Sequence, residues 1–384
     1  MSPRTVKTVI RPPASTAAST VDYDLHGLVG IRLVDPSSHD LAAVEADIGT
    51  MKKTLDREPE ITIRFAHELP TSGVLRYVQP QEAGFTEDAF FVMADGSGGA
   101  PAARIPFDLI GQPCEILCRS GLPTVPLLRP IVNVAMLTKD AVALHASAFT
   151  YRGKGTLVAG WARGGKTSSL LAFMRGGGEF IADDHVYLSS DGNRLYGSPE
   201  PVSLRAWHLE ELPDYRQQTN WRELSHLGAS KVLGRVATAI GGSRAPTTLR
   251  KVADRVARVA EDAYVPVSPD RLFSRRSSSG KLDKAFLAIA QDSRDVLIEQ
   301  VDGAWLADRL VLLLQSERRR LLANYLAFRF AFPSKPNDLI EHASDIERTI
   351  LVRVLAEADS YVVYHPFPAP VDELFAAMEP AILS

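Results

Sequence analysis

A glycine-rich segment at residues 160–167, with the sequence GWARGGKT, restricts the folds open to this chain more than any other feature. It matches the pattern G-x-x-x-x-G-K-[ST], in which glycines let backbone N–H groups turn toward phosphate oxygens. In that pattern the lysine reaches the β and γ phosphates of a nucleotide, and the hydroxyl binds Mg²⁺. We expect an apolar strand, Leu157–Ala159, before the segment and a helix, Lys166–Met174, after it. The sequence therefore predicts a phosphate-binding loop rather than an unrelated glycine-rich turn. The residues expected to contact the nucleotide are Gly160, Trp161, Ala162, Arg163, Gly164, Gly165, Lys166, Thr167 and Ser168.

An acidic pair, Asp183-Asp184, ends the next expected strand, Glu179–Ala182. The order strand, loop, helix, strand is typical of α/β nucleotide-binding architecture. Adjacent carboxylates at a strand end point in different directions. One could hold Mg²⁺, directly or through water, while the other accepts a proton from an attacking hydroxyl. An acidic turn is the alternative, because aspartate is common in turns, but the position after the loop's helix favours function.

A histidine, His145, lies on the strand expected at Val142–Thr150, just before the strand that leads into the loop. Its small neighbours Ala146 and Ser147 leave room for a ligand. A histidine beside phosphate and carboxylates can hold a proton near neutral pH. The alternative is a core histidine whose nitrogens are satisfied by the protein, and we favour a functional residue.

These three features together resemble a known family. The segment Leu144–Ala148, then the loop, then the acidic pair, is similar in order and spacing to the C-terminal domain of HPr kinase/phosphorylase and its HPr-kinase-like relatives. The resemblance covers roughly residues 140–210. It implies an α/β fold similar to that of phosphoenolpyruvate carboxykinase, and transfer of the γ-phosphate of ATP to a serine hydroxyl.

The resemblance also implies a role for each matching residue. Lys166 would bind the β and γ phosphates, and Thr167 would ligate Mg²⁺. Asp183 would be the general base that takes the proton from the acceptor hydroxyl, and Asp184 would support the metal. His145 would lie near the transferring phosphate.

A further stretch, Pro199–Arg205, is similar to a Pro-x-Pro-apolar-Ser-Leu-basic stretch of the HPr-kinase-like relatives. Arg205 is therefore expected to neutralise phosphate charge, with a surface or salt-bridged arginine as the alternative. The downstream signature of true HPr kinases is missing from the sequence. We therefore expect another acceptor: a serine of a protein or peptide, or a small molecule. The alternatives are a nucleotide-binding regulatory module without phosphotransfer and a carboxykinase-like reaction on a small metabolite.

The length of 384 residues suggests two domains. Short strand-like pieces separated by Gly and Pro predict a small strand-rich α+β domain at 21–122, and the nucleotide-binding domain would fill 123–384. Residues 1–20, rich in Pro, Ser, Thr and Ala, predict a disordered lead-in. Within the first domain we expect a helix over Ser38–Leu55 capped by Ser38.

The composition excludes several classes. With 43 Lys and Arg against 46 Asp and Glu, the net charge of −3 argues against a nucleic-acid partner. No run approaches the roughly 20 apolar residues that span a bilayer, so no membrane partner is expected. Cys114 and Cys118 are the two cysteines, too few for a disulfide framework, and we read them as core residues in a cytoplasmic protein. The family resemblance also implies that the protein forms a homo-oligomer.

Several other features of the sequence give weaker indications of function. The segment 231–284 is basic and ends in an expected mobile loop, where Arg276 and Lys281 could clamp an acidic substrate or simply face solvent. Strand alternation would turn His185 away from at least one member of the acidic pair. We read Trp207-His208 and the segment 364–366 as packing residues, and Ser334–Ala358 as one helix.

Overall fold

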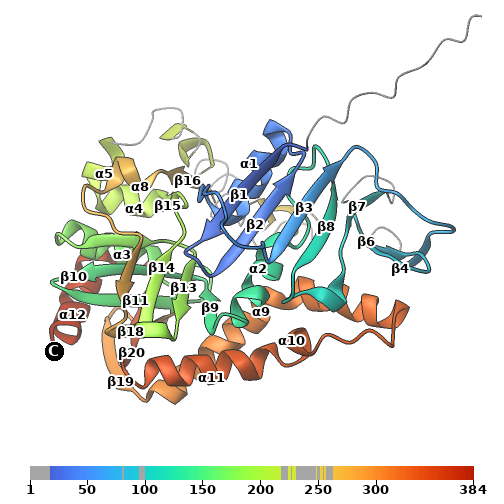
Figure 1. Cartoon of the computed structure of the whole chain (residues 1–384). Coiled ribbons are helices and arrows are strands. Elements are labelled where there is room, and N and C mark those ends of the chain that lie inside the picture. Colours follow the sequence, from blue (N-terminus) through green and yellow to red (C-terminus); the bar gives the residue numbers. More distant parts are fainter. Residues whose placement is uncertain are drawn as a thin grey trace, which may run out of the picture.

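The structure is a computed structural model, and it describes residues 18–79, 82–94, 100–217 and 263–384, with short pieces between 224 and 256. It is a mixed α/β protein with several sheets (Figure 1). Nearly all of the lead-in predicted at 1–20, and much of the basic segment 231–284, lie outside the described residues.

The first sheet has eight strands in the order β1-β2-β3-β8-β7-β6-β5-β4. Strands β2, β3 and β8 run parallel, and the other pairs are antiparallel. In β3 the apolar residues alternate and the side chains of Ile61, Ile63 and Phe65 are buried, as expected where one face of a sheet packs on a core. The bounds are β1 Thr20–Leu25, β2 Val29–Val34, β3 Ile61–Ala66, β4 Arg76–Gln79, β5 Ala83–Phe85, β6 Phe90–Met93, β7 Pro101–Arg104 and β8 Cys114–Arg119. Helices α1 Ser38–Ile48 and α2 Leu128–Leu137 and a short 3-10 turn, Phe107–Leu109, accompany it.

Helix α1 begins at Ser38 but ends seven residues earlier than predicted. Its cap is Ser37 rather than Ser38, and the helix stops at Gly49, whose φ of 77° only glycine adopts readily. Ser37 and Asp40 form a reciprocal capping box. The same Asp40 carboxylate accepts hydrogen bonds from Ser120 Oγ at 2.6 Å and the Gly121 amide at 2.8 Å, so it ties α1 to the chain that leaves β8.

We expect Asp40→Asn to destabilise the protein by about 2 kcal/mol at pH 7, because the amide cannot accept all the hydrogen bonds that the buried carboxylate accepts. Burial would raise the pKa of Asp40, but these hydrogen bonds outweigh it and lower that pKa. Because the carboxyl pKa is lower in the folded state, the ionised carboxylate stabilises the fold above the unfolded-state pKa of 3.8. This stabilisation is lost as the pH falls below 3.8 toward the folded-state pKa. Urea unfolding at several pH values should therefore show the difference shrink below about pH 4. The exposed Asp35, changed to Asn, is the matched control, and an equal loss in both variants would refute the role of Asp40.

The second sheet carries the glycine-rich loop, and it has six strands in the order β12-β10-β11-β18-β20-β19. Its central strands, β11, β18 and β20, are parallel and nearly all buried, and helices α3 and α12 pack on it (Figure 1). The bounds are β10 Ala146–Tyr151, β11 Lys154–Gly160, α3 Lys166–Arg175, β12 Glu179–Ala182, β18 Lys284–Ala290, β19 Leu297–Val301, β20 Asp359–His365 and α12 Val371–Leu383.

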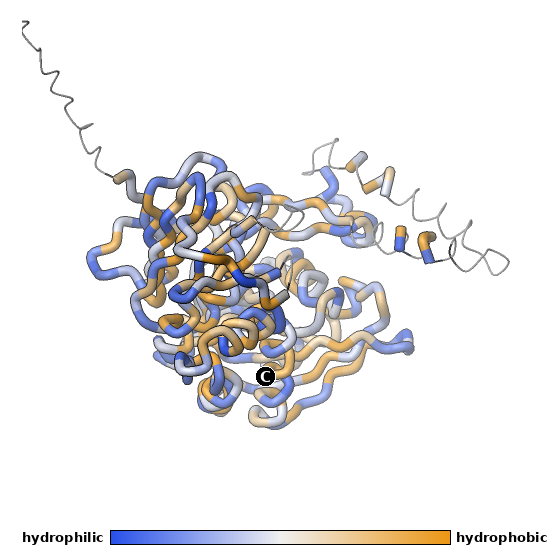
Figure 2. The backbone as a smooth tube through the Cα atoms, turned by 90° about the vertical axis from the view of Figure 1, so that its right-hand side faces the viewer, coloured by the Kyte–Doolittle hydropathy of each residue, from blue (hydrophilic) through white to orange (hydrophobic). Residues whose placement is uncertain are grey.

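Two smaller sheets flank it. The first has the order β17-β14-β13-β9, with β9 Ala141–Leu144, β13 Val186–Ser189, β14 Arg194–Gly197 and β17 Ser279–Lys281. The second pairs β15 Val202–Arg205 with β16 Tyr264–Val267. Short helical turns lie nearby at Asp191–Asn193, α4 Ala206–Glu211, α5 Pro213–Gln217 and α8 Pro269–Leu272. In Figure 2 hydrophobic and hydrophilic stretches alternate along the backbone, and several of the outermost turns are hydrophilic.

The structure corrects three of the predicted elements. The strand predicted at Val142–Thr150 is two strands, because the chain leaves one sheet at His145 and enters another. The loop predicted to be mobile near 274–281 is paired: the Ser277 amide donates to Phe180 at 2.8 Å, and β17 lies against β14. The helix predicted at Ser334–Ala358 is α10, Asp338–Glu341, followed by α11, Ala343–Leu355.

Helix α9, Gly303–Ala331, packs against both large sheets (Figure 1). Leu306 and Leu310 in its first half are buried with the second sheet, whereas Tyr325 and Phe328 in its second half are buried with the first. The Asn337 side chain then donates to two carbonyls beside the first sheet, at 2.7 and 2.9 Å. No helix in the described part of the chain is both long enough and apolar enough to cross a membrane.

Candidate functional site

The glycine-rich loop joins β11 to α3 through a strained turn. Arg163 has a φ of 63° and Gly165 a φ of 90°. A Cβ atom on Gly165 would lie 2.5 Å from the Nε2 atom of His365, so only glycine fits there. His365 is fully buried at the end of β20, and its Nε2 lies 3.0 Å from the Gly164 carbonyl. His365, which we interpreted from the sequence as a packing residue, therefore packs against the glycine-rich loop and hydrogen-bonds to its backbone.

Lys166 begins α3 and turns back over the loop. Its Nζ atom donates to the carbonyls of Gly160 and Trp161, each at 2.9 Å, and the residue is 5% exposed. Burial lowers the pKa of Lys166, while Asp183 and Asp184 oppose that shift. The ammonium group is thus held inside the loop, where a phosphate would meet it.

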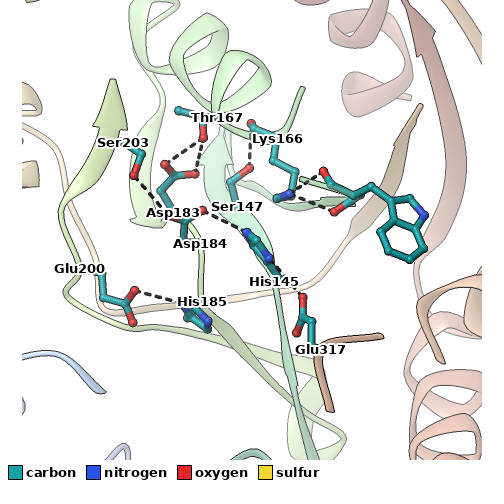
Figure 3. A network of polar contacts seen from close by, with 12 residues as sticks. His145, Ser147, Lys166, Thr167, Asp183, Asp184, His185, Glu200, Ser203 and Glu317 are labelled. Atoms are coloured by element: carbon teal, nitrogen blue, oxygen red, sulfur yellow. Dashed lines mark hydrogen bonds and ion pairs between the residues drawn. The ribbon is translucent and has the colours of Figure 1, made fainter. Parts of the chain in front are cut away.

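Thr167 and Asp183 form the inner part of the site. Both oxygens of the Asp183 carboxylate lie within hydrogen-bond distance of Thr167 Oγ1, at 3.0 and 3.1 Å (Figure 3). Asp183 is completely buried, and burial followed by the neighbouring Asp184 charge raises its pKa. It does not line the cavity described below.

Asp184 faces the opposite way, because its φ of 71° makes a sharp turn between β12 and β13. Its Oδ1 lies 3.2 Å from His145 Nε2, and the other ring nitrogen, Nδ1, lies 3.2 Å from Glu317 Oε1 (Figure 3). The three side chains are 31–33% exposed. Burial would lower the pKa of His145, but the bonds to Asp184 and Glu317 raise it to about 9. The imidazole is therefore a cation at neutral pH that can donate to both carboxylates.

A cavity of about 260 Å³ brings these groups together. One wall is the loop and the start of α3, and another is the pair His145 and Asp184. Arg205 lines the cavity with its guanidinium carbon 5.4 Å from the Trp207 ring centre and 6.0 Å from that of Tyr264. The lining thus combines cations suited to phosphate with flat aromatic faces.

His208 fixes the position of this wall. The Arg205 amide donates to its Nδ1 at 3.2 Å, so the proton of the neutral ring is on Nε2, which donates to Ser168 Oγ at 3.0 Å. Burial, followed by the Arg205 charge, lowers the pKa of His208 to about 3, which keeps the ring neutral. His208 is therefore a buried residue held by two hydrogen bonds, and both it and its neighbour Trp207 line the cavity.

Most of the predicted site residues meet here. Those lining the cavity are Ala162, Arg163, Gly164, Gly165, Lys166, Thr167, Ser168, His145, Asp184 and Arg205. Gly160 is the buried end of β11, and Trp161 points outward with 59% of its surface exposed, so neither lines the cavity. Arg276 and Lys281 do not line it either.

The sequence interpretation missed several residues. His185 was expected to turn away, but the turn at Asp184 interrupts the strand, so His185 lines the same cavity and stacks on His145 with ring centres 5.8 Å apart. Its Nδ1 lies 3.0 Å from Glu200. The others lining the cavity are Ser203, Trp207, His208, Tyr264, Phe367 and Ala369.

Thr167 on the cavity wall and Asp183 directly behind it offer oxygen donors of the kind that Mg²⁺ prefers. Thr167 Oγ1 and the Asp183 carboxylate are hard ligands held side by side. Within the described ranges no group of three or more His, Cys, Asp or Glu side chains could hold a metal by itself. A metal here would therefore need phosphate oxygens and water to complete its shell, which is how Mg²⁺ usually binds in nucleotide sites.

No protein-family model matches the chain, and a search of curated proteins finds no match.

Proposed function

We propose that the protein is an ATP- and Mg²⁺-dependent kinase that transfers the γ-phosphate to a hydroxyl, with a nucleotide domain like that of the HPr-kinase family. The observation that carries the proposal is that the loop residues Lys166 and Thr167 share one cavity with the His145–Asp184 pair. In-line phosphoryl transfer needs little more than positioned phosphates, a metal and a base.

The contacts favour a different division of work between the two aspartates from the one predicted from sequence. Asp183 is completely buried against Thr167, so we assign it with Thr167 to the metal. Asp184 lines the cavity and contacts His145, so we assign it as the base that accepts the proton of the acceptor hydroxyl. When bound, Mg²⁺ would neutralise the phosphate oxygens.

The remaining cavity residues handle charge and orientation. Lys166 would donate to the β and γ phosphates, and the His145 imidazolium would hold the Asp184 carboxylate in place beside them. Arg205 would offset negative charge that builds on the transferring group. Trp207 and Tyr264 keep the Arg205 guanidinium between two aromatic rings, which limits the orientations it can adopt.

A thermal melt with ATP, ADP and GTP, each with and without Mg²⁺, tests nucleotide binding. At about 100 times Kd a ligand stabilises the fold by about 2.7 kcal/mol, a shift of several degrees. We expect a Mg²⁺-dependent shift that Lys166→Ala removes and Lys154→Ala, on the same strand-loop unit but at the far end of β11, retains. No shift with any nucleotide would overturn the proposal.

A further inference from the structure

A second cavity, of about 560 Å³, lies where the first sheet, the start of α2 and helix α9 meet. Its floor is the chain that enters α2, rich in Pro and Leu, and side chains from β8 and α9 complete it. The volume is within the range of sites that take small molecules. Its charged lining residues are Arg119, Arg129, Arg320, Asp47 and Glu317.

This cavity shares a wall with the site already described. Glu317 lines the second cavity, and its Oε1 atom lies 3.2 Å from His145 Nδ1. The opposite nitrogen of that ring contacts Asp184, the proposed base. Glu317 therefore joins the lining of the second cavity to the His145–Asp184 pair of the first.

The charges of the second cavity favour an anion. Arg129 is paired with Glu200 at 3.1 Å, and Glu317 is paired with His145, so these two largely cancel. Arg119 on β8 lines the cavity and makes no ion pair with the part of the chain that the structure describes. Burial raises the pKa of Asp47 to about 6, with Arg129 opposing the shift, and this carboxylate faces two further arginines of the lining, Arg119 and Arg320.

We propose that this cavity holds the phosphate acceptor, a small hydroxycarboxylate whose carboxylate binds Arg119 and whose hydroxyl points past Glu317 toward Asp184. The inference rests on the proposed kinase function. An arginine fork suits a carboxylate in particular, because it can donate two parallel hydrogen bonds. The apolar floor would cover the carbon chain between the two polar ends. In the transfer step the acceptor oxygen forms a bond to the γ-phosphorus, the bond to the β-phosphate oxygen of ATP breaks, and the hydroxyl proton passes to Asp184.

Saturation-transfer NMR with small hydroxycarboxylates, among them glycerate and 3-hydroxybutyrate, tests this directly. Each is paired with a neutral counterpart in which a hydroxymethyl group replaces the carboxylate. We expect at least one carboxylate to bind and its neutral counterpart not to. Arg119→Ala should weaken binding about tenfold or more, because a charge-assisted hydrogen bond is lost. Arg119→Lys should weaken it less, and Arg76→Ala, an arginine of β4 that does not line this cavity, should have no effect.

The outcomes separate this inference from the proposed function. A carboxylate that binds the wild type, and still binds Lys166→Ala while MgATP does not, supports the cavity as a distinct acceptor site. MgATP binding with no carboxylate binding, or carboxylate binding unchanged in Arg119→Ala, overturns the inference and leaves the kinase function standing. Failure to bind any nucleotide removes the kinase function and, with it, the acceptor role. A bound carboxylate that is not phosphorylated by MgATP would also overturn the inference.

Discussion

Asp184→Asn is expected to lower phosphoryl transfer by about 10²–10⁴-fold, the usual contribution of a general base, while nucleotide binding stays nearly unchanged. The amide keeps the size of the carboxylate but cannot accept the hydroxyl proton. Its contact with His145 is weakened rather than lost, since the Asn carbonyl oxygen can still accept from the ring. Transfer would be followed as ADP release dependent on an added acceptor, and binding as the Mg²⁺-dependent thermal shift.

Asp183→Asn distinguishes the two assignments of the acidic pair. With Asp183 on the metal, that variant should lose the Mg²⁺-dependent part of the thermal shift, because the shell around Thr167 loses a carboxylate. The opposite pattern, with Asp183→Asn impaired in transfer alone and Asp184→Asn impaired in binding, would restore the assignment made from the sequence. Asp191→Asn, an exposed aspartate in a short turn away from the cavity, is the control. Nucleotide binding without any acceptor-dependent turnover in the wild type would instead favour a regulatory module.

The inner part of the site could be predicted because its signals are local. The loop, its strand and its helix are contiguous, and the acidic pair ends the following strand. The separate roles of Asp183 and Asp184 could not be predicted, since they depend on a left-handed turn at Asp184 that no residue preference required. The break at His145 was missed for a similar reason: the strand is divided by its partners, β13 on one side and β11 on the other, and not by its own residues.

Glu317 shows what sequence reasoning could not reach. It sits within the charged run Ser316–Arg320 of a long helix, where a glutamate is usually a solvated surface residue. Only the path of α9 between the two large sheets brings it to His145, which is far away in the chain. The second cavity has the same origin, because its walls come from the first sheet, from α2 and from α9.

Arg318→Met is expected to destabilise the protein by about 3–5 kcal/mol, the usual effect of removing one partner of a buried ion pair. Arg318 on α9 pairs with Glu347 on α11 through both guanidinium nitrogens, and the two side chains are 7% and 5% exposed. Arg318 also donates to Ser344 at 3.0 Å. Without it, the Glu347 carboxylate would be buried with no cation, in a position where burial already raises its pKa against the effect of Arg318. Thermal and urea unfolding would measure the loss, roughly 5 °C in Tm.

The double variant Arg318→Met with Glu347→Leu should recover most of that stability, because apolar side chains of similar size can replace a buried pair at little net cost. Arg348→Met is the matched control: Arg348 joins the same two helices through Asp308, but both side chains are about half exposed, so its loss should cost at most about 1 kcal/mol. Equal losses in the buried and exposed variants, or no recovery in the double variant, would contradict the argument. Since Arg318 follows Glu317 directly, this pair also fixes the part of α9 that reaches the His145 ring. At temperatures where it is still folded, the single variant should therefore also transfer phosphate more slowly than the wild type. The double variant should restore both the stability and the transfer rate.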